Sequence, residues 1–380
     1  MVYRLITLVL TGLLLAGCER QVDSDAISAT ATAVDSIAND QDLAASTAAT
    51  WQQQTLAGQQ SLESLRQFAS ACAQLRAQAN PETLESARQA WRQAHQQLLL
   101  LSPLFSLGDT NPGLFLPLVT SRYLLDAWPI EPGYLDSFDI YLHSGLVNDI
   151  AIELTADNIR QQHGLTTDSD VILGMHAAAY LLWGEDGQRS YSEFADVPLT
   201  EIQRRNGLKQ VDLPSNRRAT LLILQTTLLE DDLSQLLYRL EQQASALSAT
   251  YLSLAPGVQQ ELWRSALLKL LQQVVLQVPV QGEEWHQHNL YAGHSNLSLA
   301  AQLQSIEALL YSQNGNVQPL AHWLVTENQA QQFRTALQRA EQMLREFAGD
   351  WQTPAESFTT ELQGLLQQLI AGLSIKSSGH

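Results

Sequence analysis

Residues 174–187 read GMHAAAYLLWGEDG, and between Gly174 and Gly184 they hold one titratable side chain, His176. The apolar run between two glycines predicts a tightly packed helix. In a helix, a glutamate three residues after a histidine shares its face, and the two side chains make half of a metal site. Here that partner position is Ala179. On its own, His176 therefore fits either a hydrogen-bonded core histidine or the remainder of a ligand site.

Helical spacing continues along most of the chain, and no segment alternates with period two. Asn80-Pro81-Glu82 has the composition of a helix start, with a cap residue, a proline and an acid in order. A long amphipathic helix is predicted from Pro214 to about Leu254. Further helices are predicted at 258–278, 296–312, 327–349 and 355–373. Residues 102–136 contain five prolines and several glycines and are predicted to be irregular and helix-poor.

Long helices joined by short breaks predict an all-α fold of two antiparallel, four-helix-type bundles. We place an N-terminal bundle with the Gly-x-His-x-x-Ala motif at residues 51–205 and a C-terminal bundle at 206–375. The chain length is consistent with two domains. No sequence repeat relates the two halves.

The N-terminus, MVYRLITLVLTGLLLAGCER, has the pattern of a lipoprotein signal. Its apolar run is too short to span a bilayer and ends in small residues before Cys18. We therefore predict a signal peptide at 1–17, lipidation of Cys18, and a flexible tether over 18–50, where large apolar side chains are scarce. Glu19 favours the outer membrane, facing the periplasm. An ordinary secretory signal or an uncut anchor is the alternative.

Composition restricts the partners. The formal net charge is −18, and removal of Arg4 with the signal would make it −19. So acidic a chain is not expected to bind nucleic acid through its surface, and it would attract cations. The one remaining cysteine, Cys72, cannot form an intramolecular disulfide and is predicted to be a small buried apolar group rather than a catalytic thiol.

A second polar cluster, EEWHQHNLYAGH, covers residues 283–294. Glu283 and His286 would share a helical face, and His294 would reach them only after a bend. Glu283, His286 and His294 could therefore hold a metal ion. A solvated turn between two helices explains the same residues equally well.

These segments together resemble the imelysin-like, or insulin-cleaving-metalloprotease-like, family. GMHAAAYLLWGED is similar to its G-x-H-x-x-E-[FY]-L-L-W-G motif, and EEWHQHNLYAGH to its E-D-E-H-S-x-F-S-D-N-T-H stretch. The similarity continues, in chain order, through residues 83–98, 126–136, 145–150, 189–194 and 216–233. The resemblance implies two helical bundles with a groove between them, export, and association with iron or metal uptake.

The chain also departs from the family pattern. Ala179 replaces the motif glutamate, and Trp285 replaces an acid of the second stretch. His176, Glu283, His286 and His294 remain as candidate ligands for zinc, copper or iron, and the lost oxygens argue against a ferric site. Peptide hydrolysis is doubtful because it needs a general base beside a metal-bound water.

Three functions follow from these patterns. The first is an exported lipoprotein that binds a metal ion or small ligand in the groove and assists iron or metal uptake, with iron-uptake or haem proteins as partners and Cys18 as membrane anchor. The second is a metallopeptidase of the family. The third is a degenerate member that acts as a partner-binding scaffold.

Overall fold

The computed structural model describes residues 24–279, 289, 291–312 and 315–374, and this part is all-α, as predicted. The described residues form no β-strand, only an isolated antiparallel bridge between Phe138 and Tyr141. Three short 3-10 helices, η1 to η3, cover Leu99–Leu101, Tyr191–Phe194 and Gln210–Asp212. The α-helices are α1 (Ser24–Ala77), α2 (Pro81–Leu98), α3 (Ser102–Thr110), α4 (Pro112–Asp126), α5 (Pro132–Leu135), α6 (Ala156–Gln162), α7 (Met175–Trp183), α8 (Glu201–Arg205), α9 (Pro214–Glu241), α10 (Ala246–Leu252), α11 (Pro256–Leu276), α12 (Ser295–Tyr311), α13 (Ala321–Leu324), α14 (Glu327–Glu346) and α15 (Glu356–Ser374).

The chain divides into two units, residues 1–41 and residues 42–380. Residues 24–41 of the first unit are helical, and the second unit contains the remaining elements. The predicted tether therefore differs from the structure over residues 24–50, which all belong to α1. Residues 42–50 are fixed by contacts that composition does not reveal: the Thr47 hydroxyl donates to Gln259 Oε1 (2.5 Å), and Tyr251 Oη donates to the Thr47 carbonyl (2.9 Å). Cys18 lies outside the described residues.

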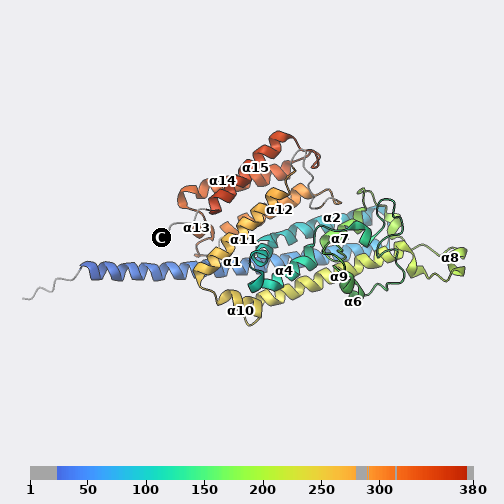
Figure 1. The fold of residues 1–380 in the computed structure, drawn as a ribbon, viewed down its shortest axis with the longest axis horizontal. Helices are drawn as coiled ribbons and strands as arrows, with labels where there is room; N and C mark the ends of the chain where they lie inside the picture. Colours follow the sequence, from blue (N-terminus) through green and yellow to red (C-terminus); the bar gives the residue numbers. More distant parts are fainter. Residues whose placement is uncertain (1–23, 280–288, 290, 313–314, 375–380) are drawn as a thin grey trace, which may run out of the picture. The chain divides into compact units, whose positions relative to one another are not determined.

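The second unit contains two groups of packed helices. In the first group, α2 packs on α7, α7 on α9, and α1 contacts both α2 and α9 through Ser61 and Gln59. In the second group, α11, α12, α14 and α15 each pack on two others of the four (Figure 1). Helices α11 and α12 join the groups by contacts with α3 and α2. The predicted division near residue 205 differs from this grouping, because α9 packs with the first group.

The proline-rich region 102–136 is helical, contrary to our prediction. Pro103, Pro112 and Pro132 each lie in the first turn of a helix, where the missing N–H costs no hydrogen bond. Pro117 lies inside α4, two residues after Phe115 takes a non-helical conformation. The prolines therefore start helices and bend one of them, and α4 ends at Asp126.

The long helix predicted from Pro214 to Leu254 is two helices, α9 and α10. Helix α9 ends at Glu241, and the side chain of Ser245 caps α10 by accepting from the N–H of Ser248 (3.2 Å). The predicted helices at 258–278, 296–312, 327–349 and 355–373 are confirmed as α11, α12, α14 and α15, to within a few residues at each end. Within the described residues, no helix combines the length and hydropathy needed to cross a bilayer.

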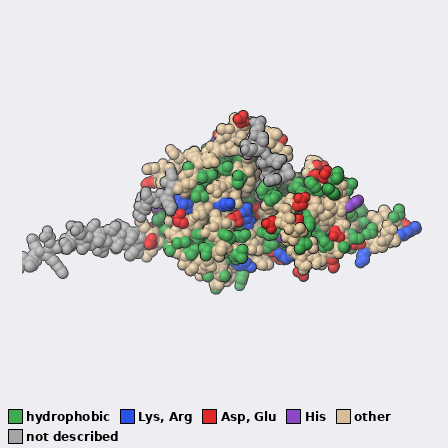
Figure 2. Space-filling model, viewed as in Figure 1, with side chains coloured by type: hydrophobic (Ala, Val, Ile, Leu, Met, Phe, Trp, Pro, Cys, Tyr) green, Lys and Arg blue, Asp and Glu red, His purple; other side chains and the backbone are tan. Residues whose placement is uncertain are grey.

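Cys72 is buried in the core, as predicted, with 1% of its surface exposed. Figure 2 shows that basic side chains on the visible face are scattered among acidic and apolar ones. The expected absence of a nucleic-acid partner remains a prediction.

Candidate metal site

His176 lies in the first turn of α7, and close contact with α4 fixes this turn. Gly174, just before α7, has φ of 94°, and a Cβ there would lie 3.0 Å from the carbonyl oxygen of Leu125. Only glycine combines this backbone conformation with such an approach. The start of α7 therefore rests against the end of α4, and His176 lies beside Asp126 with 3% of its surface exposed.

Helix α2 is attached to α7 by two hydrogen-bonding side chains. The indole N–H of Trp91 donates to the carbonyl of Met175 (2.8 Å), and the guanidinium of Arg88 donates to the carbonyl of Leu182 (3.0 Å from Nη2). Trp91 is fully buried and belongs to the apolar face of α2. One turn later on this face is His95, which is also fully buried. The packing of α2 on α7 therefore turns His95 toward His176.

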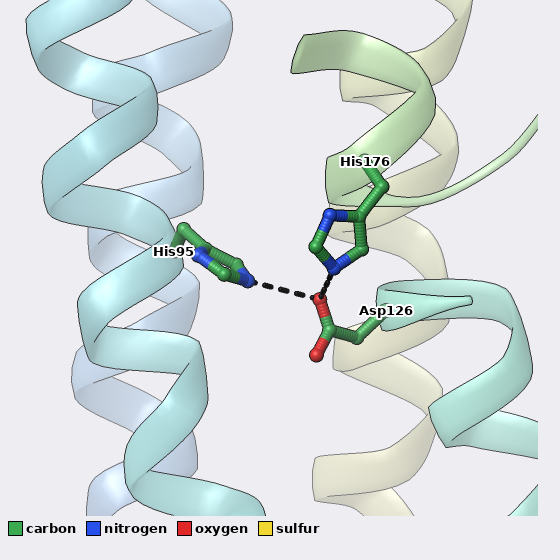
Figure 3. Close-up of side chains that lie close together, drawn as sticks. All are labelled: His95, Asp126 and His176. Atoms are coloured by element: carbon green, nitrogen blue, oxygen red, sulfur yellow. Dashed lines mark hydrogen bonds and ion pairs between the residues drawn. The ribbon is translucent and has the colours of Figure 1, made fainter. Parts of the chain in front are cut away.

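Asp126 lies between the two imidazoles, and both contact the same carboxylate oxygen (Figure 3). The Nε2 atoms of His95 and His176 lie 3.0 Å and 3.1 Å from Asp126 Oδ1. The two rings face each other edge-on with centroids 5.2 Å apart. Three elements, α2, α4 and α7, thus bring two nitrogens and one oxygen to a single buried point.

The charge state of the cluster follows from burial and proximity. Burial raises the pKa of Asp126, but the neighbouring His95 and His176 outweigh it and hold this pKa well below its usual range. Burial lowers the pKa of His95, and Asp126 opposes this only in part. The favoured state near neutral pH has an ionised Asp126 that accepts from a neutral His95 imidazole.

The donor set fits a divalent metal ion. Ligand atoms of His95, Asp126 and His176 all lie within 4.8 Å of one another. Two ligands at about 2.1 Å from a metal and at right angles to each other are about 3.0 Å apart, which matches the nitrogen–oxygen distances of the cluster. Two imidazoles and one carboxylate are the ligands that iron(II), zinc and copper(II) accept. A metal would replace the Nε2 protons that now point at Asp126.

The ligands predicted from the sequence do not all belong to this cluster. His176 belongs to the cluster. His294, directly before α12, is buried beside it, and its Nε2 lies 2.7 Å from Nε2 of Gln96. Burial, with smaller effects of His95 and Arg92, lowers the pKa of His294 to about 4. Glu283 and His286 lie outside the described residues, so their role stays a prediction.

Sequence reasoning missed His95 and Asp126. A signal was present for each: His95 lies on the apolar face of the helix 81–98, and Asp126 is the acid at the start of a family-like segment. A titratable residue on a buried helix face must have a polar partner. Spacing alone cannot supply that partner, because it comes from another helix.

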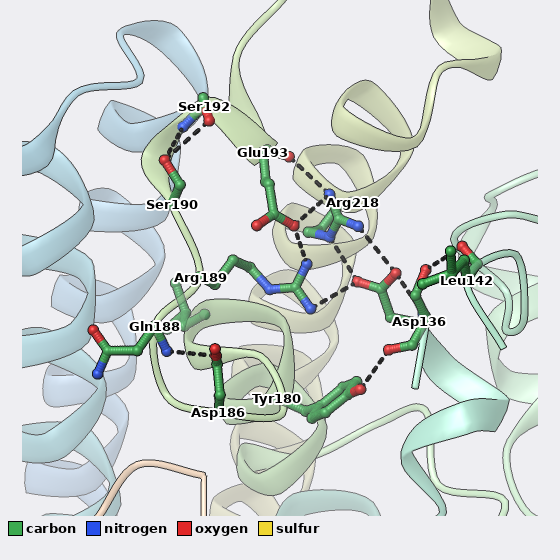
Figure 4. Close-up of polar contacts among 12 residues, drawn as sticks. Asp136, Leu142, Tyr180, Asp186, Gln188, Arg189, Ser190, Ser192, Glu193 and Arg218 are labelled. Carbon is green, nitrogen blue, oxygen red and sulfur yellow. Dashed lines mark hydrogen bonds and ion pairs between the residues drawn. The ribbon is translucent and has the colours of Figure 1, made fainter. Parts of the chain in front are cut away.

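A second buried polar cluster secures the segment after α7 (Figure 4). Asp136, with no exposed surface, accepts from Arg218 at both carboxylate oxygens (2.6 Å and 3.0 Å) and from Arg189 at Oδ2 (3.1 Å). Glu193 contacts Arg189 Nη1 at 2.6 Å. Tyr180, on α7, donates to the carbonyl of Ser137 (2.6 Å). These contacts connect the segments before and after α7 to Arg218 on α9.

A pocket of about 480 Å³ is lined by residues that belong to neither cluster. It is formed by segments 133–152 and 162–172, and the exposed His143 lines it. None of His95, Asp126 and His176 lines this pocket.

The segment leading into α7 contains a pH-sensitive contact at His163. Its Nδ1 accepts from the N–H groups of Ile172 (3.2 Å) and Leu173 (3.3 Å), and burial, the largest influence, lowers its pKa from 6.5 to about 4. Protonation must break these bonds, so the folded state binds fewer protons than the unfolded state between these pH values. Stability is expected to be full above pH 6.5 and to fall by about 1.4 kcal/mol per pH unit down to pH 4 through this group.

The test is urea unfolding at several pH values between 7 and 4 for the wild type and His163→Gln, which keeps an acceptor but does not titrate. In the variant, the free energy of unfolding should fall less steeply with decreasing pH, and the difference in slope should correspond to nearly one proton. His143→Gln, at an exposed histidine, serves as the control and should match the wild type. Equal slopes in all three proteins would refute the assignment.

Comparison with known proteins gives consistent results. The family model described as Imelysin, or peptidase M75, matches residues 53–375. A solved imelysin-like protein from Psychrobacter arcticum superposes with a TM-score of 0.61 at 15% identity, covering 89% of this chain and 94% of its own. A protein from Parabacteroides distasonis, named as an iron-regulated protein A precursor, superposes with a TM-score of 0.58 at 11% identity, covering 88% and 94%. No curated protein matches this chain.

Proposed function

Because this chain belongs to the imelysin family, we propose that it is an exported lipoprotein that binds a divalent metal ion at His95, Asp126 and His176 and assists iron or metal uptake. The observation that carries the proposal is the convergence of these three side chains on one buried point. The name of the Parabacteroides distasonis protein, an iron-regulated precursor, supports both the link to iron and the export. Lipidation of Cys18 in the outer membrane is part of the proposal.

Asp126 and His95 compensate in this proposal for the missing motif glutamate. Ala179 is buried with 1% exposure and offers no ligand atom. Asp126 reaches the His176 imidazole from α4 instead, at 3.1 Å. The site therefore has one carboxylate, supplied from α4, and a second imidazole, supplied by His95 from α2. Two nitrogens and one oxygen favour iron(II), zinc or copper over a ferric ion, which prefers more oxygens.

Calorimetric titration of the purified full chain with iron(II) under anaerobic conditions, zinc and copper(II) tests this function. The wild type is expected to bind at least one ion with micromolar or tighter affinity. His95→Gln and His176→Gln keep a polar side chain but remove a ligand nitrogen, and each should weaken binding by more than tenfold.

The matched control is His322→Gln, at an exposed histidine of α13, which should bind as the wild type does. Circular dichroism of each variant verifies the fold. If the wild type binds none of the three ions, the proposed function is wrong. If His322→Gln weakens binding as much as the other two variants, the ion binds elsewhere.

A further inference from the structure

Asn289 is the polar residue that contacts the far edge of the His95 ring. It has 2% of its surface exposed and a left-handed backbone with φ of 71°, which asparagine tolerates better than most residues. Its Nδ2 lies 3.2 Å from His95 Nδ1 and also donates to Ser298 Oγ. Its Oδ1 is buried and has no hydrogen-bond partner within the described part of the chain.

This contact determines which nitrogen of His95 carries the proton. An amide NH₂ can only donate, so Nδ1 must accept and the proton of the neutral imidazole must be on Nε2. Nε2 then donates to Asp126, at 3.0 Å. The ring is held by stacking on Trp91, with centroids 4.9 Å apart. In this tautomer, Nε2 has no lone pair for a metal.

We propose that Asn289 is a positioning residue that switches the tautomer of His95 when a metal binds, an inference that rests on the proposed function. On metal binding the Nε2 proton would leave to solvent and free the lone pair for the metal, and Nδ1 would take one proton from solvent, so the imidazole would stay neutral with no net proton released. The Asn289 amide turns by about 180° and presents Oδ1, which accepts from Nδ1. The oxygen that is now unpartnered gains a hydrogen bond.

Ser298 can serve both orientations of the amide. Its hydroxyl now donates to the carbonyl of His294 (3.0 Å) and accepts from Asn289 Nδ2. A hydroxyl can rotate, so after the amide turns it can donate to Oδ1 instead. Each orientation leaves one atom of the amide without a partner, so the two are close in energy and a bound metal can decide between them.

Nitrogen-15 NMR of the imidazoles tests the switch, with His95→Gln identifying the signal. The metal-free wild type should carry the His95 proton on Nε2, and zinc should move it to Nδ1. Asn289→Asp supplies only acceptors and should place a proton on Nδ1 without metal. Asn289→Gly fits the backbone conformation and removes the amide.

Calorimetry at pH 8 gives the second measurement. Asn289→Asp should bind zinc at least as tightly as the wild type, whereas Asn289→Gly should bind about tenfold more weakly. The inference is wrong if metal-free wild type carries the proton on Nδ1, if Asn289→Asp leaves the tautomer unchanged, or if both variants weaken binding equally. Should the wild type bind none of iron(II), zinc and copper(II), the proposed function fails, while the metal-free spectra still decide whether Asn289 controls His95.

Discussion

Replacement of Asp126 by Asn is expected to reduce metal affinity by more than roughly 100-fold, the upper end of what loss of an outer-shell partner costs. The substitution removes the one charged ligand of the cluster and keeps its size. Both imidazoles contact Oδ1, at 3.0 Å and 3.1 Å, and an amide oxygen can still accept there. The fold should therefore survive, with a loss of about 1–3 kcal/mol in the free energy of unfolding.

Calorimetric titration and urea unfolding of the same samples separate these two effects. Asp157→Asn serves as the control. It removes the same charge, but from an exposed position of α6 that does not belong to the cluster. It should leave both quantities unchanged. Metal binding by Asp126→Asn at wild-type affinity would remove Asp126 from the ligand set.

Replacement of Asp136 by Asn is expected to cause the largest loss of stability, about 3–5 kcal/mol. The amide cannot satisfy Arg189 and Arg218 together, because Arg218 uses both carboxylate oxygens and Arg189 uses Oδ2, and one of these oxygens becomes an NH₂ donor. Both arginines are at most 8% exposed, so water cannot replace the lost contact. The remaining acid, Glu193, has a side chain that is 42% exposed and compensates poorly.

Thermal unfolding should show this loss as a fall in Tm on the order of 10 °C. Glu361→Gln breaks the contact with Arg339, in which both side chains are about half exposed, and is expected to cost at most about 1 kcal/mol. Similar losses for the two variants would show that burial does not strengthen the Asp136 cluster. A loss below 1 kcal/mol for Asp136→Asn would contradict the charge argument outright.

The two substitutions are expected to have different consequences because the two carboxylates have different surroundings. Asp126 contacts two imidazoles and no guanidinium or ammonium group in the described part of the chain, so removing its charge affects the ligand set more than the fold. Asp136 lies among cations, and removing its charge leaves two buried guanidinium groups with too few acceptors. The two acids are ten residues apart in sequence, and the sequence gives no sign of this difference.

Much of the helical structure was predictable because local rules determine it. The helix that begins at Pro81 has an asparagine cap whose side chain accepts from Thr83, and its apolar residues recur at helical spacing. The buried helix around His176 was also predictable from its composition. The proline-rich region misled us because proline disfavours a helix interior but suits its first turn, and composition does not distinguish these positions.

By itself, the sequence determined the all-α class, the helices of the second bundle and the family resemblance, since each depends on local spacing or on motifs read in order. Only the tertiary structure decided that α9 joins the first bundle and that residues 24–50 of the expected tether belong to α1. It also decided the candidate site. His95, Asp126 and His176 come from three helices, and their meeting depends on the close contact at Gly174 and on the packing of Trp91 against α7. Such contacts join residues that are distant in sequence, and helical periodicity carries no information about them.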